Sequence, residues 1–66
     1  MTVRELCKML AYDLDIVILR KSDRGNSFQE IFRGMAVEAM LDPDFQDLKV
    51  REWDFRSEFG NKQIYV

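Results

Sequence analysis

The first ten residues, MTVRELCKML, alternate apolar and polar positions with the period of a helix. Thr2 and Glu5 have the T-x-x-E spacing of a capping box, in which each side chain accepts a hydrogen bond from the other residue's backbone amide. The pattern predicts a helix from Val3 to Ala11 with one apolar side. The residues on that side recur at i, i+3, i+4 and i+7: Val3, Leu6, Cys7 and Leu10.

A run of four apolar residues, Ile16 to Leu19, lies between charges in DIVILRK and predicts a strand from Asp15 to Lys21. The turn-forming residues SDRGNS follow and predict a hairpin loop before a second strand, Phe28 to Arg33. Successive side chains of a strand point to opposite faces of its sheet. The first strand therefore has apolar side chains on both faces.

The second half repeats the order helix, strand, turn, strand. We expect Gly34 to end the second strand, and MAVEAML to form a short helix from Met35 to Leu41 that Pro43 terminates. In LKVREWDF the apolar phase changes midway, so either a bulge lies near Arg51 and Glu52 or the strand is apolar on both faces. The remaining predicted elements are a strand over Leu48–Phe55, a hairpin loop over Arg56–Asn61 and a strand over Lys62–Val66.

The predicted order is α-β-β-α-β-β over a single domain, residues 1–66. We expect an α+β fold with a mainly antiparallel sheet of about four strands and two short helices on one face. Two short helices can cover only one face of such a sheet, so the other face is expected to contact another chain. We therefore predict a homo-oligomer, most simply a dimer. The candidate partner interface is Val17, Leu19, Trp53, Phe55 and Tyr65.

Composition narrows the classes of function. A chain of 66 residues buries only about 60% of the surface that it exposes when unfolded, so its stability is marginal without additional support. A single cysteine and no histidine exclude an internal disulfide and a structural zinc site built by this chain alone. Ten basic against 12 acidic residues argue against direct nucleic-acid binding. With no apolar run of membrane length and one unpaired cysteine, we predict a cytoplasmic protein.

Two segments have some features of ligand sites, but their sequences favour turns. DPDFQD carries Asp42, Asp44 and Asp47, but a calcium loop needs a glycine and a glutamate where Asp47 and Trp53 stand. SDRGNS contains a glycine among polar residues, but it lies between two strands rather than before a helix that could bind phosphate. We expect neither a metal nor a cofactor.

Nucleophilic and acid–base chemistry are also not favoured. Cys7 lies on the apolar side of the first helix, has no histidine partner and is expected in the core. Glu52 can pair with Asp54 or Glu58, but acidic surface strands commonly contain such pairs. A chain this short rarely encloses a substrate cleft of a few hundred cubic ångströms. We predict that the protein is not an enzyme.

The order of short motifs resembles a family of small uncharacterised proteins of phages and prophages of Gram-positive bacteria. Those proteins begin with TVxELxxxL, continue with VxI and xFxGxAxEAMxD, and end with VxxWxx and xIYV. The resemblance implies a phage or mobile-element accessory protein with no assigned reaction; some proteins of this size and origin block host defence machinery, including CRISPR effectors. The matching stretches are Thr2–Leu10, Ile16–Leu19, Ile31–Asp42, Leu48–Phe55 and Ile64–Val66.

These observations favour a small, non-enzymatic interaction or regulatory protein that self-associates and can bind a host protein. A first alternative is an inhibitor of a host nucleic-acid enzyme that uses an acidic surface as a phosphate mimic. That surface would comprise Asp42, Asp44, Asp47, Glu52, Asp54 and Glu58. A second alternative is a binder of a nucleotide or small ligand between subunits, with Arg20, Arg24 and Arg33 as anion contacts.

Overall fold

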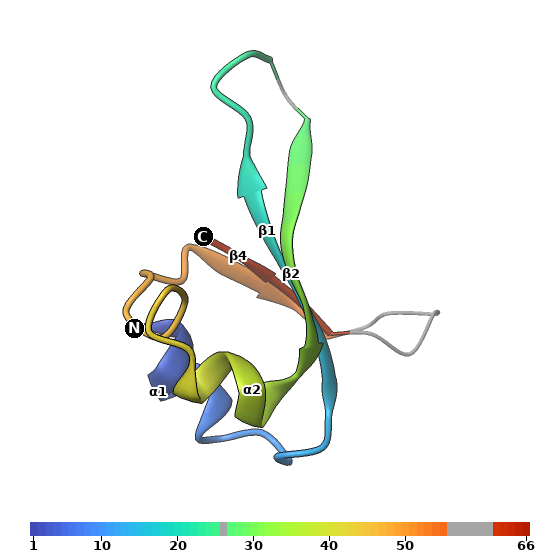
Figure 1. Cartoon of the computed structure of the whole chain (residues 1–66). Helices are drawn as coiled ribbons and strands as arrows, with labels where there is room; N and C mark the ends of the chain where they lie inside the picture. The colour runs from blue at the N-terminus through green and yellow to red at the C-terminus, as the bar shows by residue number, and fades with distance from the viewer. Residues whose placement is uncertain (26, 56–61) are drawn as a thin grey trace.

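The computed structural model describes residues 1–25, 27–55 and 62–66, and its architecture is α+β as expected (Figure 1). The element order α-β-β-α-β-β is confirmed. The second predicted hairpin loop, residues 56–61, lies outside the described residues. The elements are α1 (Val3–Cys7), β1 (Asp15–Lys21), β2 (Phe28–Met35), α2 (Ala36–Leu41), β3 (Glu52–Asp54) and β4 (Lys62–Tyr65).

The four strands form one sheet in the order β2-β1-β4-β3. The β1–β2 and β3–β4 pairs are antiparallel, as the sequence pattern predicts, whereas the central β1–β4 pair is parallel. The sheet is therefore mixed, with two antiparallel pairs joined side by side. Parallel neighbours need a long crossover connection, and here the chain between β1 and β4 supplies it through β2, α2 and β3.

The capping box that begins α1 is present. The Thr2 hydroxyl accepts from the Glu5 amide at 3.2 Å, and the Glu5 carboxylate accepts from the Thr2 amide at 3.0 Å. The predicted end at Ala11 is wrong, because α1 ends at Cys7. After Cys7 the backbone hydrogen bonds join residues three positions apart, as in a 3₁₀ turn. The Met9 amide donates to the Leu6 carbonyl at 3.0 Å, and the Leu10 amide donates to the Cys7 carbonyl at 3.1 Å.

The junction of β2 and α2 differs from the prediction that Gly34 ends the strand. Strand β2 continues through Gly34 to Met35, and α2 begins at Ala36. The Glu38 carboxylate accepts from the Met35 amide at 3.3 Å. A side chain at Gly34 would displace that carboxylate, so glycine permits this close approach rather than breaking the strand.

Only three residues of the predicted strand Leu48–Phe55 pair with β4. The preceding residues lie beside the N-terminus instead: the Val3 amide donates to the Leu48 carbonyl at 2.9 Å, and the Val50 amide donates to the Met1 carbonyl at 2.8 Å. The change in apolar phase therefore marks a change of pairing partner. Neither a bulge nor a strand apolar on both faces, the two alternatives from sequence, accounts for it.

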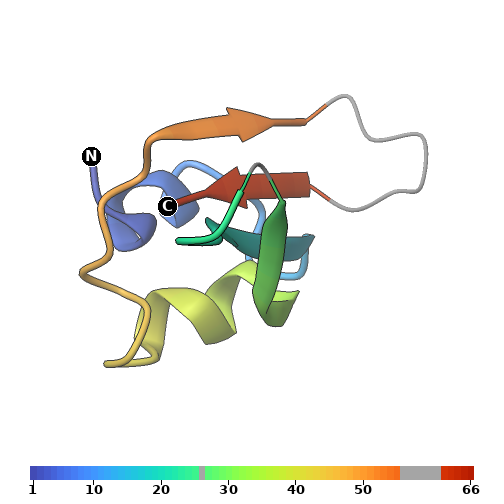
Figure 2. The ribbon, with the colours of Figure 1, turned by 90° about the horizontal axis from the view of Figure 1, so that it is seen from above.

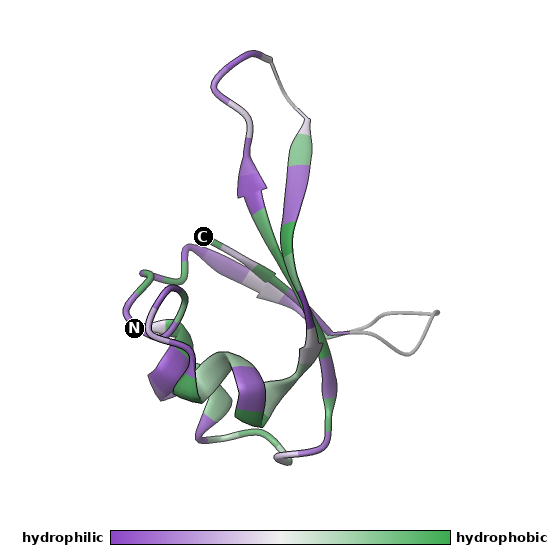
Figure 3. Cartoon of the chain, viewed as in Figure 1, coloured by the Kyte–Doolittle hydropathy of each residue, from purple (hydrophilic) through white to green (hydrophobic). Residues whose placement is uncertain are grey.

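The core lies between the sheet and the two helices, which pack on the same face (Figures 1 and 2). The β1–β2 hairpin extends beyond the helices, and its Ser22–Ser27 loop is closed by a 2.9 Å bond from the Ser22 amide to the Ser27 carbonyl. Hydrophilic residues gather toward this tip (Figure 3). The buried core cluster is Val3, Leu6, Cys7, Ile16, Ile18, Ala36, Ala39 and Ile64.

Candidate functional site

The sheet has a helix face, which bears Ile16, Ile18 and Ile64, and a far face opposite the helices. The cross-strand register shows on which of these two faces each remaining strand residue lies, because directly paired side chains share a face. Val17 pairs with Arg33 and Gln63, and the register places the next far-face residue of β1, Leu19, beside Glu30 and Tyr65. The far face as used below comprises Asp15, Val17, Leu19, Lys21, Phe28, Glu30, Arg33, Met35, Glu52, Asp54, Gln63 and Tyr65.

Val17 and Leu19, two residues of the predicted partner interface, lie on the far face. Val17 is nevertheless only 5% exposed in the single chain, and Leu19 is half-buried. The cross-strand neighbours of Val17 are the long side chains of Arg33 and Gln63. Val17 therefore has little apolar surface left to offer a partner, and the exposed apolar surface of this face lies elsewhere.

An aromatic pair crosses the far face. The rings of Phe28 and Tyr65 lie 5.0 Å apart in an edge-on arrangement, although their strands are separated by β1. The Tyr65 hydroxyl donates to the Gln63 side-chain oxygen at 2.8 Å. Phe28 remains 52% exposed. It is the most accessible large apolar residue of this face, and the sequence analysis did not single it out.

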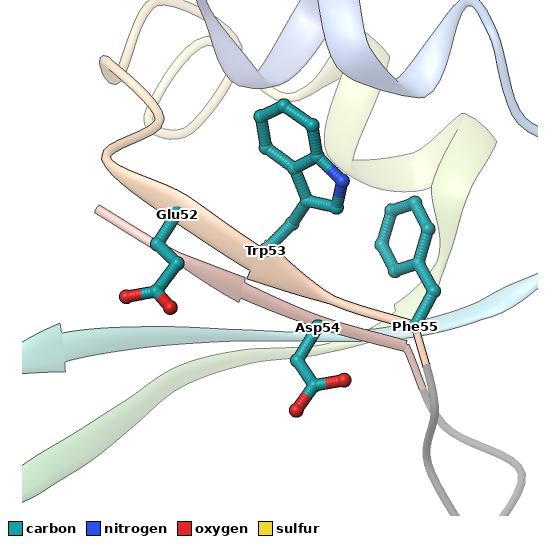
Figure 4. A pocket seen from close by; sticks show the side chains of 4 residues that line it. All are labelled: Glu52, Trp53, Asp54 and Phe55. Carbon is teal, nitrogen blue, oxygen red and sulfur yellow. The ribbon is translucent and has the colours of Figure 1, made fainter.

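The edge strand β3 divides the predicted partner interface between the two faces. Trp53 and Phe55 point toward the helices, whereas Glu52 and Asp54 point to the opposite side (Figure 4). The register agrees, because Trp53 pairs with the fully buried Ile64. The five interface residues predicted from sequence therefore do not form one surface. The three residues of β3 and Phe55, which follows them, line a shallow hollow of about 310 Å³, in which Trp53 is 48% exposed.

A second hollow, of about 210 Å³, brings together residues that the sequence analysis did not connect. Its two cations are Lys21, at the end of β1, and Arg51, just before β3. The Arg51 amide donates to the Tyr65 carbonyl at 2.8 Å, which places this end of β3 beside the end of β4. Lys21 and Arg51 are 30 positions apart in the sequence, and no local pattern predicts that the parallel pairing of β1 with β4 brings them together. The other residues that line the hollow are Phe28, Glu52, Tyr65 and Val66.

The three arginines proposed as anion contacts are separated. Arg33 forms an ion pair with Glu30, with 2.6 Å between the guanidinium nitrogen and the carboxylate oxygen. This carboxylate raises the pKa of Arg33 through a hydrogen bond and its charge. Arg24 lies in the hairpin loop, and Arg20 alternates to the face opposite Leu19 and Arg33. The arrangement does not make one guanidinium cluster.

The acidic residues proposed as a phosphate mimic also occupy separate places. Asp42 ends α2, and its carboxylate accepts from the Asp44 amide at 2.9 Å, as expected for a turn. Glu52 and Asp54 lie on the far face, away from the helices (Figure 4). Glu58 is outside the described residues. Within residues 1–25, 27–55 and 62–66, no three His, Cys, Asp or Glu side chains lie close enough to hold a metal ion.

Cys7 is fully buried in the core, as predicted. Burial raises the pKa of its thiol, because the charged thiolate is disfavoured away from water. A protonated, inaccessible thiol is a poor nucleophile. The role of Cys7 that these contacts support is packing between α1 and the sheet.

Comparison with known proteins yields no match to a family model, a curated protein or a solved structure. The function is therefore inferred from the far face, the two hollows and the sheet edges. Among the helices of the described part of the chain, none is long and apolar enough to cross a membrane.

Proposed function

We propose that this chain is a small, non-enzymatic interaction protein that self-associates through its sheet. The observation that carries the proposal is the placement of both helices on one face (Figure 2). Exposed apolar side chains, Phe28 and Met35, lie on the other side of the sheet along its edge strand β2. Covering them in an assembly would add apolar burial to a domain too small to bury much alone.

The resemblance to small phage proteins supports a narrower version of this proposal. In it, the chain is a cytoplasmic accessory protein encoded by a phage or a mobile element, and its assembly presents a surface to a host protein. The feature that supports an interaction role over an enzymatic one is the burial of the only thiol of the chain, Cys7, in the core and away from the residues that line the two hollows.

Size-exclusion chromatography with light scattering tests self-association. We expect a mass of about twice the 7.9 kDa of one chain at tens of micromolar protein, and a fall toward the monomer mass on dilution. A single species of 7.9 kDa at high micromolar concentration would contradict the proposal.

A second candidate function, binding of an anionic ligand with an aromatic ring, is favoured by the smaller hollow. There Lys21 and Arg51 lie beside the rings of Phe28 and Tyr65. Cations contribute charge to phosphate binding, and aromatic rings stack on a base. A thermal-shift screen with nucleoside mono- and triphosphates tests this function, because a bound ligand raises the apparent stability. No shift at millimolar nucleotide would rule it out.

A further inference from the structure

We propose that a second copy of this chain pairs antiparallel with the outer edge of β2, so that Glu30 of each protomer lies opposite Arg33 of the other. The inference rests on the self-association proposed above and specifies its surface and register. It places a two-fold axis between Ile31 and Phe32. The result is one continuous sheet that runs through both protomers.

Strand β2 is the longer of the two edge strands of the sheet. It has eight residues against three in β3, and within the described chain it pairs with β1 alone. The outer edge of a strand presents amide and carbonyl groups that can pair with another chain. A long edge strand on a projecting hairpin is therefore accessible to a second copy (Figure 1).

The β-bulge in β2 makes its sequence self-complementary on one face. Ile18 pairs with Phe32 and Leu19 pairs with Glu30, so Ile31 is the extra residue. In a regular strand, Glu30 and Arg33 would point to opposite faces, because side chains alternate and these two residues are three positions apart. Because the bulge takes up one residue, both side chains lie on the far face, at equal distances along the chain from the proposed axis.

Charge favours this pairing of two copies. Glu30 and Arg33 already attract each other within one chain, at 2.6 Å, and their side chains remain 44% and 59% exposed. In the proposed register each carboxylate lies opposite a guanidinium of the second protomer. The two-fold symmetry produces this contact twice, as in any interface that uses the same patch on both subunits.

The apolar residues of β2 fit the same register. Phe28 and Met35 lie on the far face at its two ends and are 52% and 38% exposed. Positions 28 and 35 are also equidistant from the axis between Ile31 and Phe32. Phe28 of each protomer is therefore opposite Met35 of the other, and the interface has apolar contacts on both sides of the charged pairs.

The other edge of the sheet does not suit a second copy. Antiparallel pairing of β3 with itself about Trp53 would set Glu52 opposite Asp54, two carboxylates on one face. Like charges directly opposite each other destabilise a strand pair. The charge pattern thus distinguishes β2, which is self-complementary, from β3, which repels its own copy.

Charge-swap variants test the register. In Glu30→Arg and in Arg33→Glu, each homodimer would contain two like-charge contacts, so we expect dimerisation at least about tenfold weaker than in the wild type. An equimolar mixture of the two variants restores both opposite-charge contacts and should form a heterodimer. The matched control is Glu52→Arg, which makes the same charge change on the far face at the other edge and should leave dimerisation unchanged.

The double variant Glu30→Arg/Arg33→Glu keeps the ion pair within the chain, so it tests the register even if a single variant fails to fold. It should dimerise as the wild type does. In a mixture with isotope-labelled wild type, however, native mass spectrometry should find only homodimers, because the mixed dimer has like charges at both contacts.

The outcomes separate this inference from the proposed function. A wild-type chain that stays monomeric overturns both. A wild-type dimer that mixes freely with the double variant overturns the β2 register and leaves self-association standing. The β2 register is also overturned, with self-association still standing, if Glu52→Arg weakens the dimer as strongly as Glu30→Arg. The two protomers would then contact each other across the whole far face rather than along the β2 edge.

Discussion

At the scale of single residues, the capping box of α1 is the feature most directly encoded. Thr2 and Glu5 are three positions apart, and both reciprocal hydrogen bonds form. The bond from the Thr2 amide lowers the pKa of the Glu5 carboxyl, with a smaller contribution from the Thr2 side chain. The stabilising form is the carboxylate, so the contribution of Glu5 to stability depends on pH.

The sign of this dependence follows from the lowered pKa. Stability from the Glu5 carboxylate is present above its ordinary pKa of 4.5 and is lost as the pH falls through the lower value of the folded state. We expect Glu5→Gln to be less stable than the wild type at pH 7 and nearly equal to it at pH 2. Urea unfolding at several pH values measures the gap. A gap that stays constant with pH would contradict the role of the carboxylate.

At the scale of elements, the junction of β2 and α2 depends on one glycine and one glutamate. A side chain at Gly34 would collide with the Glu38 carboxylate and come within 3.2 Å of the Phe32 ring. The carboxylate also holds the Met35 amide at the start of α2. Two residues four positions apart therefore meet at the point where the strand ends and the helix begins.

A double-mutant cycle tests this junction. We expect Gly34→Ala to destabilise the wild type by about 1 kcal/mol, because the lost hydrogen bond and the crowding outweigh the better strand propensity of alanine. In a Glu38→Ala background, from which the obstructing carboxylate is absent, Gly34→Ala should cost much less. Chemical denaturation of the four proteins gives the coupling free energy. A coupling near zero would mean that the two side chains act independently.

At the scale of the whole molecule, one layer of apolar residues between the sheet and the helices supports the fold. Ile64 lies in the middle of that layer, on the strand that pairs with both β1 and β3. We expect Ile64→Val to lose about 1 kcal/mol, which is a large part of the stability of so small a domain. The control is Leu41→Ala at an exposed position of α2, where a loss within about 0.5 kcal/mol is expected.

Thermal and urea unfolding of both variants would measure the difference. Equal losses at the two positions would mean that Ile64 is not part of the stabilising core. The comparison also bears on self-association, because a variant of the core weakens each protomer, whereas a variant of the β2 edge acts on the contact between protomers.

The local elements could be read from the sequence because their causes are local. The capping box, the β1 strand over Asp15–Lys21 and the turn residues before β2 each depend on side chains a few positions apart. The α+β class follows from the order of these elements. Their ends were less predictable, since β2 continues through Gly34 by pairing Gly34 with Ile16 and Met35 with Asp15 on the neighbouring strand.

The tertiary structure alone decided how the two halves meet. The parallel pairing of β1 with β4 sets which residues share a face, and this separated Trp53 and Phe55 from Val17 in the predicted interface. It also buried Val17 and brought Lys21 beside Arg51. These results depend on contacts between residues tens of positions apart, whose register is set by the packing of the whole core rather than by any local pattern.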